Sequence, residues 1–336
     1  MRTLLRIHQL LSAGSLRSSV KYRQIGAALM RIAFGTLTAV LYALHANQRY
    51  FLWGPASVVS RPDNLTLLAQ ARTWTLYRLF SSALGFEFVY WLGLIVSVMF
   101  ALGLFTRFSS ILFFLFTWSL YQRNLYAIDG GENLIIILAI YLMFADLSAL
   151  SLDRILFAKN QERSTFWLFG MLHNFAVTAC LVQLSILYFE SAFYKIQGHV
   201  WSDGTALYYI LRTNEFSLPG WSELIWRSAA LVTLGTYATI MFEVVHPFLM
   251  WHRRLKYLMF AGAVCLHTGI GILMGLPYFS LTMISAHAVL FDDSKYLALV
   301  RWVRDRTQPI WPRARVSPQS GLIRDVWGNR PALSSE

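Results

Sequence analysis

The stretch FWLFGMLHNFAVTACLVQLSILYF, residues 166–189, contains 24 consecutive residues without Asp, Glu, Lys or Arg. At about 1.5 Å per residue, a helix of this length crosses the ~30 Å hydrocarbon core of a bilayer. The rest of the chain has the same character, since 56% of its 336 residues are hydrophobic and 14% are charged, with a mean hydropathy of +0.48. Soluble globular domains carry about a quarter charged residues. The sequence therefore predicts a helical integral membrane protein.

Seven further apolar runs are candidates for membrane spans. We expect an all-α fold, a polytopic membrane helix bundle of about eight transmembrane helices, with a basic cytoplasmic N-terminal segment at 1–24, a transmembrane domain at 25–300 and a basic, largely disordered cytoplasmic tail at 301–336. The seven runs are 25–46, 86–105, 108–122, 133–149, 224–245, 255–276 and 277–291.

The basic residues are distributed unevenly between the two sides of this topology. With the N-terminus inside, 20 Lys and Arg residues lie on the cytoplasmic side and 7 on the outer side. This asymmetry follows the positive-inside rule and predicts a multi-pass protein of the cell membrane with both termini in the cytoplasm. We therefore expect the positive charge, +12 in total, to interact with the lipid bilayer, and we expect no nucleic-acid partner.

The densest group of polar residues follows the fifth span. Lys195 and Glu190 come near the outer end of that helix, where a lysine with apolar neighbours loses its proton more readily than in water and can act as a base. A second interpretation stays open, in which Lys195 extends to the lipid headgroups and pairs with Glu190. Further candidate pocket residues in this segment are Trp201, Asp203 and Tyr208.

Ionisable groups inside the predicted spans are few. Each must face protein or water, because even the lower insertion scales give a cost of about 2.5–3.5 kcal/mol for a charged side chain at the bilayer centre. A functional site and a neutral histidine hydrogen-bonded between helices are both open interpretations. These residues are Arg31, His173, Glu243, His267 and His287. No metal site is expected, since Glu243-Val-Val-His246 has the spacing of half a di-iron site but no second such pair accompanies it.

Several short blocks of sequence resemble the horizontally transferred transmembrane domain family, whose best-known members are the vitamin K-dependent gamma-carboxylases. The resemblance covers about residues 25–300. Within this family, the sequence is similar in particular to the sporulation-delaying protein B branch, whose members are membrane proteins needed to mature a secreted peptide toxin. The blocks begin at Arg31-Ile-Ala-Phe-Gly, Asp129-Gly-Gly-Glu-Asn, Ser151-Leu-Asp, Trp201-Ser-Asp-Gly, Glu243-Val-Val-His-Pro-Phe, Cys265-Leu-His and Tyr278-Phe-Ser-Leu-Thr-Met.

The resemblance implies roles for particular residues. In the carboxylases a lysine shortly after the fifth span deprotonates vitamin K hydroquinone, and the matching position here is Lys195. The Phe-His pair of their seventh span is matched by Leu266-His267, which implies a catalytic role for His267. Their Phe-Ser-x-x-Met block is matched by Phe279, Ser280 and Met283. The implied cofactor is a quinol such as reduced vitamin K.

Two classes of function follow, and a third is less favoured. The first is a membrane-embedded, carboxylase-like enzyme that modifies or matures an exported peptide, with Lys195 as base. The second is a non-catalytic assembly or export factor that holds the peptide and a small accessory protein at the membrane. A transporter is third, because the sequence has no internal repeats and few acidic residues within the spans.

The charge asymmetry makes the topology testable. Single cysteines at Ser57 and Ser202, in a background without Cys180 and Cys265, should react with a membrane-impermeant thiol reagent in intact cells, whereas a cysteine at Ser317 should not. Labelling at Ser317 with protection at Ser202 would invert the topology and place Lys195 on the cytoplasmic side.

Overall fold

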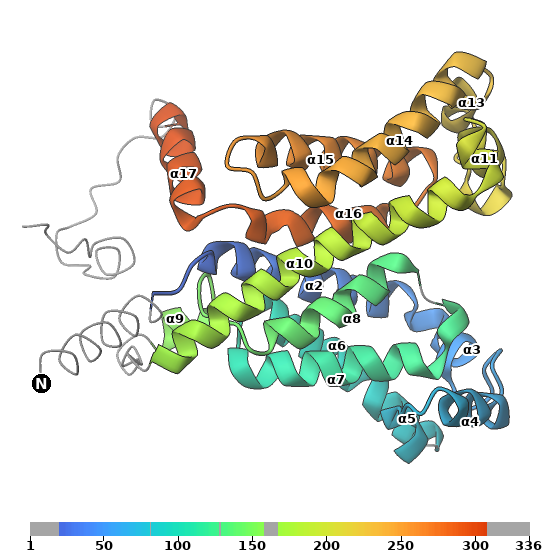
Figure 1. Ribbon diagram of the computed structural model, residues 1–336. Helices are drawn as coiled ribbons and strands as arrows, with labels where there is room; N and C mark the ends of the chain where they lie inside the picture. The colour runs from blue at the N-terminus through green and yellow to red at the C-terminus, as the bar shows by residue number, and fades with distance from the viewer. Residues whose placement is uncertain (1–19, 81, 128, 158–166, 308–336) are drawn as a thin grey trace, which may run out of the picture. The chain divides into compact units, whose positions relative to one another are not determined.

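The computed structural model describes residues 20–80, 82–127, 129–157 and 167–307, and every regular element in these ranges is a helix (Figure 1). The fold class predicted from the sequence is confirmed. The long helices are α2 (Gln24–Leu44), α6 (Ala83–Leu102), α7 (Thr106–Arg123), α8 (Gly130–Leu142), α10 (Trp167–Gln197), α14 (Ala229–Leu249), α15 (Leu255–Leu273), α16 (Pro277–Ala286) and α17 (Asp293–Thr307). The short helices are α3 (Arg49–Trp53), α4 (Arg61–Gln70), α5 (Leu76–Leu79), α9 (Leu152–Leu156), α11 (His199–Ser202), α12 (Ala206–Ile210) and α13 (Trp221–Trp226).

Each of the eight predicted spans coincides with a helix. Five of these helices, α2, α6, α10, α14 and α15, are long and apolar enough to cross a membrane, and α8 is a shorter apolar helix. Crossing by α7, α8 and α16 stays a prediction. Some helix ends differ from the predicted span ends: α10 continues past Phe189 to Gln197, and α8 ends at Leu142 and not at 149. Lys195 lies in the last turn of α10, near the end of that helix as expected.

The bundle has two ends that differ in the length of their connections. At the long-loop end, helices α2, α7, α10 and α15 finish and α6, α8, α14 and α16 begin, and the segments 45–82 and 198–228 connect them there (Figure 1). At the opposite, short-loop end, α6 passes to α7 and α14 passes to α15 through brief turns. The topology expected from the charges places the long-loop end outside the cell.

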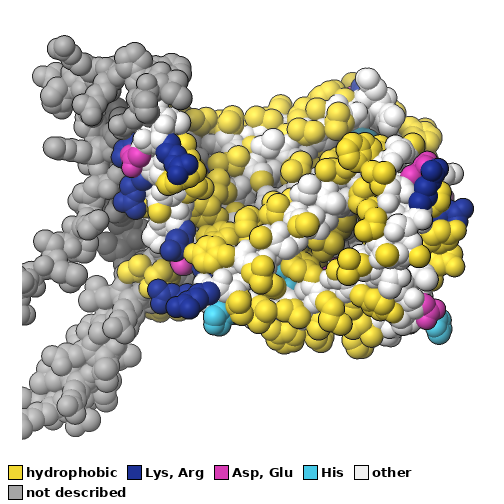
Figure 2. All heavy atoms as spheres, turned by 90° about the horizontal axis from the view of Figure 1, so that it is seen from above, with side chains coloured by type: hydrophobic (Ala, Val, Ile, Leu, Met, Phe, Trp, Pro, Cys, Tyr) yellow, Lys and Arg dark blue, Asp and Glu magenta, His cyan; other side chains and the backbone are white. Residues whose placement is uncertain are grey.

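The outer surface of α14 and α15 is largely apolar. Figure 2 shows hydrophobic side chains over most of this face, with charged side chains gathered toward its ends. Exposed side chains of this surface include Leu231, Leu234, Met241, Phe248, Leu258 and Ile272. An apolar surface of this extent is unusual for a soluble monomer and is suited to contact with lipid.

A close approach of two helices fixes the packing of α2 against α6. A Cβ atom at Gly35 would lie 2.6 Å from the backbone nitrogen of Ala101 and 2.8 Å from its Cα. Only glycine leaves room for this contact, as is common where membrane helices pack through small residues.

Arg31 is fully buried on α2 at the short-loop end. Its Nη1 donates to the carbonyl oxygens of Phe100 and Ala101, at 2.7 and 2.6 Å, and its Nη2 donates to that of Leu150 at 2.9 Å. Phe100 and Ala101 belong to the last turn of α6, where unsatisfied carbonyls carry partial negative charge. Arg31 therefore links α2 to the end of α6. This contact gives a structural reason for one of the ionisable residues within the predicted spans.

Two of the sequence blocks cap helices. Asp129 accepts hydrogen bonds from the backbone of Gly131 and Glu132, and the Glu132 carboxylate accepts from the backbone of Asp129, which forms a capping box at the start of α8. Asp153 accepts from the backbone nitrogens of Phe105 and Thr106, both at 2.7 Å, at the start of α7. The acidic residues of these blocks thus have a structural role at helix N-termini.

A second unit begins at Ser294, and its described part, which ends at Thr307, belongs to α17. Its exposed side chains include the apolar Leu299, Val300, Trp302 and Val303. Arginines at 301, 304 and 306 accompany them. The first residues of the tail expected from position 301 are therefore helical. The remainder of that tail, 308–336, and most of the predicted N-terminal segment, 1–19, lie outside the described residues.

The α2–α6 contact gives a stability prediction with a matched control. Gly35→Ala should lower the midpoint of thermal unfolding of the detergent-purified protein, because overpacking costs about 1–3 kcal/mol. Gly269→Ala on α15 should leave the midpoint unchanged or raise it, since a Cβ there would have no atom within 4 Å and alanine favours a helix. Equal midpoints for Gly35→Ala and the unaltered chain would show that the two helices do not pack as described.

Candidate functional site

Lys195 is held in an ion pair that joins α10 to α14. Its Nζ donates to both carboxylate oxygens of Glu243, at 2.8 and 2.9 Å, and to the hydroxyl oxygen of Ser191 at 2.5 Å. The Glu243 side chain is 8% exposed and that of Lys195 is 21% exposed. Ser191 is one helical turn before Lys195, so the helix itself orients the amine toward α14.

An aromatic ring lies on another side of the amine. After α10, Gly198 begins a turn into α11, and this turn brings the Trp201 ring to 5.3 Å from the Lys195 Nζ. At this distance the face of the indole attracts a cation. Trp201, Glu243 and Ser191 together surround the amine at the long-loop end of the bundle.

Tyr188 extends the site toward the interior of the bundle. It is two turns before Lys195 on α10 and is almost completely buried. Its hydroxyl lies 2.7 Å from Nε2 of His267 on α15, and its ring lies over the His246 ring with centroids 4.0 Å apart. The long helices α10, α14 and α15 therefore meet at this tyrosine.

His246 and His287 form a second buried pair, with their Nε2 atoms 3.1 Å apart. Nδ1 of His287 lies 2.7 Å from the carbonyl oxygen of Met283 and must donate to it. Neutral His287 is then an acceptor at Nε2, so His246 donates from its Nε2. This assignment leaves Nδ1 of His246 as a lone pair with no hydrogen-bond partner.

Two further polar atoms near this pair are also buried without a hydrogen-bond partner. They are Nδ1 of His267 and the hydroxyl of Ser280 on α16. The Phe279 ring lies 5.6 Å from the His267 ring, centroid to centroid. A buried polar atom without a partner costs about 1–3 kcal/mol, so several of them on adjacent helices indicate a place for water or a ligand.

The structure places seven of the predicted site residues in two adjoining groups. Lys195, Trp201 and Glu243 form the ion-pair group, and His267, Phe279, Ser280 and His287 belong to the helices around Tyr188 and His246. The alternative pairing of Lys195 with Glu190 is not what the structure shows, because Glu243 takes that place and Glu190 is exposed. Phe193 and Tyr194, neighbours of Lys195 in sequence, are exposed as well.

His173 lies far from this cluster. It is 22 residues before Lys195 on the same helix, or about 33 Å along the helix axis. Its Nδ1 accepts from the backbone of Asp146 at 3.0 Å, and its Nε2 donates to the carbonyl of Tyr22 at 2.7 Å. Both nitrogens are satisfied, so His173 is a structural histidine at the short-loop end.

Asp203 and Tyr208 are near the long-loop end but do not contact Lys195. Asp203 is exposed and follows the last residue of α11. The Tyr208 hydroxyl accepts a hydrogen bond from Arg212, whose guanidinium also lies 5.3 Å from the Trp226 ring. Tyr208 therefore belongs to a separate group with Arg212 and Trp226.

Sequence reasoning did not select Tyr188 and His246. Both could have been found by helical spacing: Tyr188 is seven residues before Lys195, and His246 is three residues after Glu243, which places each on the same helix face as a selected residue. Their contact across helices could not be read from spacing alone.

The fold and the site define an all-helical, multi-pass membrane protein with a lysine–glutamate ion pair at one end and a buried tyrosine–histidine cluster behind it. The chain is 24% identical over 203 residues to the uncharacterized protein YitO of Bacillus subtilis (strain 168), a match that spans 57% of this chain and 63% of YitO, just under two thirds of that relative. It is 23% identical over 224 residues to the sporulation-delaying protein SdpB of the same organism, covering 66% of this chain and 68% of SdpB. No protein-family model and no solved structure matches the chain.

These similarities support a distant relation to the sporulation-delaying protein, which is one part of the resemblance expected from the sequence. They give no support for the gamma-carboxylase part of it, and carboxylase-like chemistry is treated below as a proposal.

The ion pair predicts a non-additive effect on stability. Glu243→Leu should lower the thermal midpoint in detergent strongly, because removing one partner leaves a charged amine in a largely buried place, at a cost of up to about 3 kcal/mol. The double variant Lys195→Met/Glu243→Leu should recover part of that loss. If the double variant loses as much stability as the two single variants lose together, the two groups do not interact.

Proposed function

We propose that this chain is a membrane protein that takes part in the maturation of an exported peptide, with Lys195 as a base at the long-loop end. The observation that carries this proposal is the ion pair of the Lys195 amine with Glu243 at 2.8 Å, on the same two helices that bring the buried Tyr188 and His246 together. The relation to the sporulation-delaying protein supports the biological setting.

The ion pair offers a route by which the lysine can become a base. When the Lys195 ammonium passes one proton to Glu243, the products are a neutral amine and a neutral carboxylic acid. Lys195 can then accept a proton at Nζ, while Ser191 and Trp201 keep the amine in position.

The residues behind Lys195 suit a quinol, such as reduced vitamin K, as cofactor. His267 and Ser280 offer buried polar atoms without partners, and Phe279 offers an aromatic ring beside His267. These three residues would hold the quinol, with Tyr188 orienting His267 through its hydroxyl. A bound quinol supplies an acidic hydroxyl and a reducing ring.

The topology and partners belong to the same proposal. With the long-loop end outside, Lys195 would meet a peptide during or after export, and both termini would be cytoplasmic. A small accessory protein would help to present the peptide. A gene for a secreted peptide next to the gene for this chain would support this setting.

The Lys195–Glu243 pair also favours a second function, a non-catalytic assembly or export factor. A lysine held by a carboxylate at 2.8 Å can also have a purely structural role, in which the ion pair joins α10 to α14. In that case the positive charge is required, but its release of a proton is not.

Substitution by arginine separates the two functions. Arginine keeps a cation but stays protonated at any physiological pH. If Lys195 is a base, Lys195→Arg and Lys195→Ala should both abolish maturation of the exported peptide, measured by mass spectrometry of the culture medium at equal membrane protein levels. Glu243→Gln should also lose activity, because an amide cannot receive the proton.

The control is Lys295→Arg, an exchange of an exposed lysine of α17 that should leave maturation unchanged. An active Lys195→Arg variant would remove the base assignment and favour the assembly factor.

A further inference from the structure

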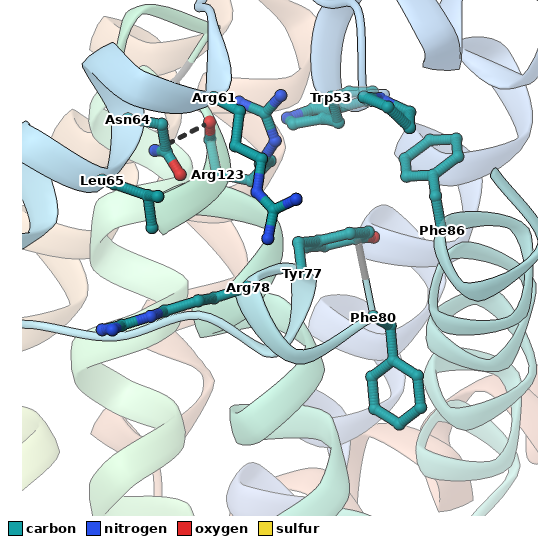
Figure 3. A pocket seen from close by; sticks show the side chains of 10 residues that line it. Trp53, Arg61, Asn64, Leu65, Tyr77, Arg78, Phe80, Phe86 and Arg123 are labelled. Atoms are coloured by element: carbon teal, nitrogen blue, oxygen red, sulfur yellow. Dashed lines mark hydrogen bonds between the residues drawn. The ribbon is translucent and has the colours of Figure 1, made fainter. Parts of the chain in front are cut away.

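A group of arginines lines a small pocket at the long-loop end, apart from Lys195 and the histidines. The pocket has a volume of about 20 Å³ and lies among α4, α5 and the ends of α6 and α7. Figure 3 shows Arg61 and Arg123 close together on one side of Tyr77, whereas Arg78 extends away from them. Trp53, Phe80 and Phe86 supply apolar walls.

Arg123 carries a buried positive charge that no carboxylate balances. It is 5% exposed and donates hydrogen bonds to the carbonyls of Val59 and Gly54 and to the hydroxyl of Ser57. All three acceptors are neutral. Among the residues that the structure describes, Arg61, Arg78 and Arg123 have no ion-pair partner, and the charges of Arg61 and Arg123 repel each other.

The nearest acidic side chains on these elements are engaged elsewhere. Glu87 on α6 is paired with Arg49 at 2.7 Å and accepts from the Trp91 indole. Asp63 on α4 accepts from the Ser60 hydroxyl at 2.5 Å. A buried charge without a counter-charge is costly, so an anion bound between Arg61 and Arg123 would compensate both guanidinium groups.

The pocket is continuous with an apolar strip on the outside of α6. The Phe80 ring, in the pocket wall, lies 6.1 Å from the Phe88 ring. Exposed side chains follow at helical spacing down this side of α6, at Leu84, Phe88, Trp91 and Ile95. Since α6 is a candidate membrane span, this strip is suited to contact with an acyl chain.

We propose that the mouth of this pocket, where Arg61 is exposed, binds the headgroup phosphate of an anionic phospholipid, with one acyl chain along the exposed strip of α6. Arg61 and Arg123 contact the phosphate, and Arg78 adds positive charge at the height of the headgroups. The lipid comes from the leaflet at the long-loop end. A free anion would use the arginines but not the strip, and a zwitterionic lipid would bring a positive group against Arg61.

The test uses the purified full-length chain in a nonionic detergent. Dioleoyl phosphatidylglycerol should raise the thermal midpoint more than dioleoyl phosphatidylcholine or glycerol phosphate at the same concentration. Arg61→Gln should weaken the apparent affinity for phosphatidylglycerol about tenfold, because the phosphate loses a hydrogen bond from a charged group. Arg72→Gln, a change at an exposed arginine outside the pocket, should leave that affinity unchanged.

A second variant tests the strip. Phe88→Ser should reduce binding of phosphatidylglycerol measured by native mass spectrometry, and the lipid-free midpoint of Arg61→Gln should match the unaltered chain, which separates lost binding from lost folding. Equal stabilisation by glycerol phosphate, equal stabilisation by phosphatidylcholine, or full affinity in Arg61→Gln would each overturn the proposal.

Discussion

The ion pair between Lys195 and Glu243 is the interaction on which the candidate site depends. It places two opposite charges 2.8 Å apart where the last turn of α10 meets the second half of α14, and both helices are candidate membrane spans. Either charge alone would be unfavourable in that place, so the two residues have to be retained or lost together. Because α10 also carries Tyr188 two turns earlier, the same contact sets the position of the tyrosine against His246 and His267.

The two ends of the bundle use their buried polar groups differently. At the short-loop end, Arg31 and His173 have their donors and acceptors largely matched by backbone groups, which is how a membrane protein fixes loops and helix ends. On α14, α15 and α16, His246, His267 and Ser280 keep polar atoms without partners, and at the long-loop end Arg123 donates hydrogen bonds only to neutral groups. Buried polar atoms without partners indicate a place for water or a ligand, and the quinol proposal rests on the atoms of this kind in His267 and Ser280.

Much of the fold could be predicted from the sequence because apolar runs such as 166–189 determine membrane helices directly. The end of α10 could not, since Glu190 and Lys195 interrupt the apolar run and only the partner on α14 shows why the helix continues past them. Glu243, His267 and His287 were found because ionisable residues are rare within spans. His173 was selected by the same rule and proved structural, because the sequence does not show which backbone groups face a histidine. Tyr188 was not selected because a tyrosine near a span end is ordinary until its hydroxyl is seen beside a histidine.

Proton exchange within the ion pair can be observed directly by infrared difference spectroscopy of the purified protein in lipid. If Lys195 works as a base through Glu243, adding reduced vitamin K should diminish a carboxylate band and produce a protonated carboxyl band, and both changes should be absent in Glu243→Gln and in Lys195→Arg. A spectrum in which Glu243 stays ionised throughout, or in which the carboxyl band persists in Lys195→Arg, would contradict a base at Lys195 and leave the ion pair as a structural link between α10 and α14.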